Sequence, residues 1–228
     1  MTLSLSRLPR VLIVSSLAIV LLGWSQFWFT QTYGDGTYFE TLSYFNLATE
    51  ISVPSVYSSA FLMLCAIILV LVSCASDAAL GRSTRHWPIL AGIFAYLSLD
   101  EFAGIHEELT PLMHHFVHLP AFLSYAWVVP VFAVLCVLAI YYLPFLLRLP
   151  RKTMILMIVS GVIYVGGAMG MEFFEAMLAA DNETMSFLGQ IERVVEESLE
   201  IVGMTMFACT LLAYLKSLVS AIDYELTA

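Results

Sequence analysis

A chain of 228 residues with 61% hydrophobic and only 12% charged residues is too apolar for an ordinary soluble domain. Its mean hydropathy of +0.90 points the same way. The formal charge of −9 argues against a nucleic-acid-binding protein, which needs a basic surface. The composition therefore predicts an integral membrane protein whose main partner is the lipid bilayer.

Six apolar stretches are long enough to cross a hydrocarbon core of about 30 Å, which takes roughly 20 helical residues. Short connections join them, so we expect one all-α domain over residues 1–228, a six-transmembrane-helix bundle. The first stretch lacks a small-x-small cleavage pattern, which favours a retained anchor over a signal peptide. In chain order the predicted spans cover residues 11–29, 55–74, 87–105, 121–147, 154–179 and 194–215.

The charged residues predict an orientation. Lys and Arg near span ends mark the cytoplasmic side, and in the six-span arrangement all of them except Arg193 fall on one side. Both termini are then cytoplasmic. All acidic residues except Asp77, Asp223 and Glu225 fall on the opposite side or in the outer halves of the spans. We therefore expect a bacterial inner (plasma) membrane protein with an acidic periplasmic face.

Acidic side chains occur inside the third, fifth and sixth predicted spans. An ionised carboxylate in hydrocarbon costs several kcal/mol, and such groups usually mark an ion path, a proton relay or a binding site. Their depths match, about one to two turns from the outer ends. Either some of them are protonated or bound metal ions neutralise them. The candidate metal ligands are Asp100, Glu101, His106, Glu107, Glu172, Glu175, Glu196, Glu197 and Glu200.

Helix geometry orders the candidates on the third span. Asp100, Gly104 and Glu107 share one face, and Gly104 would let a neighbouring helix or a ligand come close. His106 points away from that face on an ideal helix, so it joins the acids only if the helix ends near Gly104. For Glu107, and likewise for Glu192, the ordinary interpretation is a solvated acid at the level of the lipid headgroups.

On the fifth span Glu172 and Glu175 share a face with Gly161 and Ala168. A face of small residues is typical of a helix that packs inside a bundle. We therefore expect these two carboxylates to face protein.

Five segments together resemble a family of uncharacterised bacterial multi-pass membrane proteins with an SLDE...IHE motif. They are FNLATEISVPSVYSS, YLSLDEFAGIHEEL, YAWVVP, GAMGMEFFEA and EESLEIVGMTMF. The resemblance covers most of the chain, and its most specific part runs from Ser98 to Glu107. It implies that Asp100, Glu101, His106 and Glu107 act as a unit, and it implies no activity or substrate.

These observations favour a metal-binding protein whose carboxylate-rich site opens to the periplasmic side. Oxygen-rich coordination suits iron, manganese, zinc or calcium. In a metalloenzyme the ion would activate water or oxygen against a lipid-soluble substrate; the sequence does not decide whether the protein is catalytic. One alternative is a proton- or cation-coupled transporter, although the inner halves of the spans offer few polar groups beyond Ser160, Thr205 and Thr210. Another is an accessory subunit of a larger complex, whose acidic face docks membrane-protein partners.

Overall fold

The computed structural model describes residues 7–34, 40–49, 52–80, 84–106, 108, 127–171, 173–174 and 187–227. The regular structure in these ranges is helical throughout. A helix satisfies every internal backbone N–H and C=O within its own segment, which is what an apolar chain in lipid requires. The elements are α1 (Leu8–Tyr33), α2 (Glu40–Ser43), α3 (Val53–Leu80), α4 (His86–Ala103), α6 (Val128–Leu146), α7 (Arg151–Val165), the π-helix η3 (Gly166–Met171) and α9 (Phe187–Thr227).

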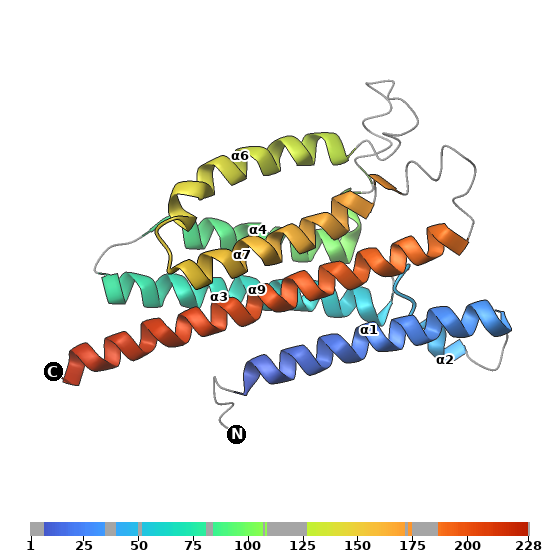
Figure 1. Cartoon of the computed structure of the whole chain (residues 1–228), viewed down its shortest axis with the longest axis horizontal. Coiled ribbons are helices and arrows are strands. Elements are labelled where there is room, and N and C mark those ends of the chain that lie inside the picture. The colour runs from blue at the N-terminus through green and yellow to red at the C-terminus, as the bar shows by residue number, and fades with distance from the viewer. Residues whose placement is uncertain are drawn as a thin grey trace.

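Five helices in the described part of the chain are long and apolar enough to cross a membrane. They are α1, α3, α6, α7 with its π-helical continuation, and α9. This confirms an all-α membrane protein. The remaining long helix, α4, has 18 residues and is not among these five; it carries Asp100 and Glu101 near its end. It nevertheless runs beside α3 within the same bundle (Figure 1).

The helices differ from the predicted spans mainly at their ends. α9 begins at Phe187 and continues to Thr227, well beyond the predicted 194–215. The predicted fifth span is divided between α7 and η3, and its last part lies outside the described residues. The fourth is observed from Val128.

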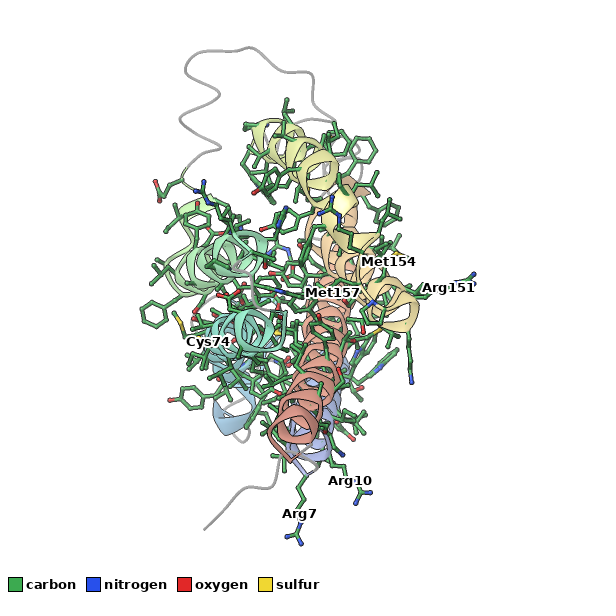
Figure 2. The ribbon with its side chains drawn as sticks, turned by 90° about the vertical axis from the view of Figure 1, so that its left-hand side faces the viewer. Arg7, Arg10, Cys74, Arg151, Met154 and Met157 are labelled. Carbon is green, nitrogen blue, oxygen red and sulfur yellow. The ribbon has the colours of Figure 1, made fainter. Side chains whose placement is uncertain are left out.

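The long helices that the structure describes, α1, α3, α4, α6, α7 and α9, alternate in direction, and the two chain termini lie at the same end of the bundle (Figure 1). Figure 2 looks onto that end, where Arg7, Arg10 and Arg151 are found. The end of α4 and the beginning of α9, which carry the candidate acids, lie at the opposite end (Figure 1). The basic and acidic ends are therefore separated along the helices, while the assignment of the acidic end to the periplasm stays a prediction.

The core lies mainly between α3, α4 and α9. Cys65 and Leu69 of α3 and Ile201 and Leu211 of α9 are completely buried. At the contact between α4 and α9, the rings of Phe94 and Phe207 stack with centroids 4.7 Å apart. The core therefore holds in place the two helices that carry the described candidate acids.

Candidate functional site

The carboxyl end of α4 turns His106 back towards Asp100. Gly104 has φ 58° and ψ 35°, the left-handed conformation that ends many helices and that glycine adopts without strain. Its N–H donates to the carbonyl of Asp100 at 2.8 Å. Beyond this turn, the backbone N–H of His106 donates to Asp100 Oδ1 at 2.8 Å, and His106 Nδ1 lies 3.0 Å from Asp100 Oδ2. The helix therefore ends near Gly104, as the sequence analysis required for His106 to lie beside the acids.

Gly104 thus ends the helix, and the expected close approach of a neighbouring helix or a ligand at this glycine stays a prediction. The pairing with Asp100 also orients the imidazole. When Nδ1 carries the proton and donates to the carboxylate, Nε2 holds the lone pair. This arrangement is typical of histidines that ligate metals, whose second nitrogen is held by a carboxylate or carbonyl. The ring of His106 packs against Trp127 at the start of α6, with centroids 4.9 Å apart.

A cavity of about 190 Å³ lies at the acidic end, between α4, α6, α7 with η3, and α9. Four carboxylic acids line it, two from α4 and two from α9, together with His106. Of the described residues that line the cavity, none is Lys or Arg. The titratable residues of the lining are Tyr96, Asp100, Glu101, His106, Tyr164, Glu196 and Glu200.

Tyr164 of α7 connects the acids to the neighbouring helices. Its hydroxyl forms a hydrogen bond with the carboxylate of Glu200, and Glu101 and Glu197 lie near enough for their charges to act on it. Sequence reasoning missed Tyr164 because an aromatic residue in the middle of an apolar span is most often part of the core. The signal that was available is its hydroxyl, which needs a partner when it is buried.

Glycines bring α7 and η3 against α9 at this point. A Cβ atom built on Gly203 would lie 2.7 Å from the backbone nitrogen of Tyr164, and one on Gly167 would lie 3.0 Å from the carbonyl oxygen of Glu196. By contrast, nothing lies within 4 Å of a Cβ on Gly161. The close contact is therefore made by Gly167 and Gly203, and Gly161 of the predicted small-residue face meets open space.

The structure brings five of the nine candidates to one cavity: Asp100, Glu101, His106, Glu196 and Glu200. Glu197 is half-buried on α9, near Glu101. The other candidates, Glu107, Glu172 and Glu175, lie outside the described residues. Within the described part of the chain, no group of three or more His, Cys, Asp or Glu side chains is arranged to hold a metal ion. The metal site therefore stays a prediction.

Glu192 differs from the sequence interpretation. It was expected to be a solvated acid, yet it is only 2% exposed. Its neighbour on the same helix, Val194, is also buried, at 1%. Glu192 lies within α9, which begins seven residues before the predicted span.

Residues 11–215 match the model of a family described as a domain of unknown function (DUF8692). The chain belongs to this family. The match confirms the predicted resemblance to an uncharacterised family and spans all nine candidate residues. No match was found among the curated proteins or among the solved structures. Membership of DUF8692 therefore assigns no activity to the cavity.

Proposed function

We propose that this DUF8692 protein binds a divalent metal ion in the acidic cavity, and that the ion acts on a lipid-soluble substrate. The observation that carries the proposal is the convergence of acids from α4 and α9 with His106 on one cavity. Iron, manganese, zinc or calcium suits such oxygen-rich ligands with one imidazole. A bound cation would also offset the repulsion among carboxylates that line the same small space.

The Asp100–His106 pair supports the proposal most directly. Asp100 contacts both the backbone N–H and the ring of His106, so it fixes the position and the tautomer of the imidazole. Asp100 is then a positioning residue, and His106, Glu101, Glu196 and Glu200 are the proposed ligands. Glu107, Glu172, Glu175 and Glu197 stay candidates for further ligands.

Two of the three inner hydroxyl groups give no support to the transporter alternative, while the third, that of Thr205, lies 2.6 Å from the hydroxyl of Ser16 on α1. Ser160 donates to the carbonyl of Met157 at 2.9 Å, and Thr210 donates to the carbonyl of Met206 at 2.8 Å. Both groups are thus satisfied within their own helices. We therefore do not propose a polar path towards the basic end through them.

Metal analysis of purified protein tests the proposal. After dialysis against a mild chelator, we expect stoichiometric metal in the wild type and at least a tenfold loss in Glu200→Ala and His106→Ala. Asp100→Asn should weaken metal affinity about 10–100-fold while the other ligands remain, which is the usual effect of changing an orienting group. Metal should also raise the melting temperature of the wild type more than that of Glu200→Ala.

The matched control is Glu108→Ala, because Glu108 is an exposed acid beside the same helix end that does not line the cavity. It should keep the metal content of the wild type. If the wild type contained only a trace amount of metal, the proposal would be contradicted. Equal metal content in Glu200→Ala, His106→Ala and the control would also contradict it.

A further inference from the structure

Helix α6 is fastened to the bundle near its two ends. Near the basic end, the hydroxyl of Tyr142 donates to the carbonyl of His86 at 2.9 Å, and the ring of Phe145 stacks on His86 with centroids 4.5 Å apart. Near the acidic end, Trp127 packs against His106. Between these points the outer face of α6 is open, with Ile140 75% exposed. Figure 1 shows α6 along the edge of the bundle, beyond α4 and α7.

An apolar cavity of about 280 Å³ lies beneath the middle of α6. Leu138 and Ala139 of α6 form one wall, and Phe94 of α4, Gly161 of α7 and Phe207 of α9 belong to the others. Along α6 the lining runs from Leu135 to Leu146, which corresponds to about 16 Å at 1.5 Å per residue. A cavity of this length with an apolar lining suits a hydrocarbon chain.

The apolar cavity adjoins the acidic one. Leu97, Leu135, Tyr164 and Val165 line both cavities. Tyr164 stands at the junction, where its hydroxyl meets the carboxylate of Glu200. The groove is therefore apolar towards the basic end and polar at the acidic end. A lipid in the leaflet on the acidic side has the same polarity along the helix axis, with its head at the surface and its chain towards the middle of the bilayer.

We propose that this groove binds a single-chain lipid that enters from the bilayer, with its chain beneath α6 and its head in the acidic cavity beside Tyr164. The head is an amine or an alcohol, because four acidic side chains outweigh the two positive charges of one divalent ion, and no described Lys or Arg in the lining offsets the remaining negative charge. The proposal rests on the proposed function, for which it names the class of the lipid-soluble substrate.

Photolabelling tests the groove. The probes are hexadecylamine and hexadecanoic acid, each with a diazirine in the middle of the chain, added to the purified full-length protein in detergent. We expect the amine to label peptides of α6 and α7 at least fivefold more than the acid does. Gly161→Phe should lower labelling by the amine at least fivefold, because the new ring occupies the open space at this position.

The matched control is Gly92→Phe. Gly92 lies on the exposed side of α4, also has nothing within 4 Å of a Cβ, and does not line the groove. A second pair tests the opposite wall. Ala139→Phe fills the groove from α6, whereas Ala133→Phe adds the same ring to the exposed side of α6. Labelling should fall only in Ala139→Phe.

Metal content, measured on the same samples, separates this inference from the proposed function. Gly161→Phe should keep its metal while it loses the lipid probe. Equal labelling of Gly161→Phe and Gly92→Phe would overturn the groove, as would equal labelling of the wild type by the amine and the acid. If the wild type is labelled specifically by the amine but contains no metal, lipid binding in the groove is supported and metal binding in the acidic cavity is rejected.

Discussion

The contact between Gly203 and Tyr164 offers a quantitative test of how α7 and α9 pack at the site. In Gly203→Ala the new Cβ would lie 2.7 Å from the backbone nitrogen of Tyr164 and 2.9 Å from its Cα. Backbone atoms cannot rotate aside as the end of a side chain can, so the helices must separate. Overpacking of this kind costs about 1–3 kcal/mol. Gly161→Ala is the matched control, because its Cβ would have no neighbour within 4 Å.

Both glycines lie inside helices, so the gain in helix propensity on changing glycine to alanine, about 1 kcal/mol, is common to the two variants. Their free energies of unfolding should therefore differ by about 2 kcal/mol, which corresponds to roughly 4–8 °C in melting temperature for a chain of this size. Thermal unfolding in one detergent, followed by circular dichroism, measures the difference. Equal melting temperatures would refute the close contact between α7 and α9.

Two further pairs of variants test the core and the orientation. Ser59→Ala should cost about 1 kcal/mol, because the hydroxyl of Ser59 donates to the carbonyl of Ser98 at 2.7 Å. Ser58→Ala should be neutral or stabilising, because in the described structure the hydroxyl of Ser58 is buried without a partner; thermal unfolding compares the two, and the reverse order would contradict these packing assignments. In a background without native cysteines, Arg151→Cys should react with a membrane-impermeant maleimide in inside-out vesicles only, and Glu108→Cys in right-side-out vesicles only. Labelling of both from the same side would contradict the predicted topology.

Hydropathy predicts most of this fold because lipid imposes one structural solution on apolar segments. Hydropathy does not predict the ends of a helix that is polar along part of its length. The first turns of α9 contain Gln190, Glu192 and Arg193, so the apolar run begins later than the helix does. The π-helix beginning at Gly166 could not be predicted either, because it depends on the local hydrogen-bond register and leaves the hydropathy unchanged.

The acidic residues of the candidate site were predictable because charged residues are rare in membrane spans. Asp100, Glu101 and Glu200 were identified because each interrupts an apolar run, and all three line the acidic cavity. Trp127 and Tyr164 line the same cavity but were not found. Aromatic residues are common in spans, so only the placement of α6 and α7 separates these two from ordinary packing residues.

The backbone at Gly104 determines which side chains meet at the end of α4. At 3.6 residues per turn, a continuous helix would place His106 about 120° around the axis from Asp100, facing away from the acids. The left-handed glycine instead ends the helix at Ala103 and returns both the N–H and the ring of His106 to the Asp100 carboxylate. Helical periodicity alone would therefore exclude His106 from the candidate site. The rule that a left-handed glycine ends a helix places His106 in that site. The segment from Ser98 to His106 is thus better understood as a helix end that builds an Asp–His pair than as a continuous acidic face.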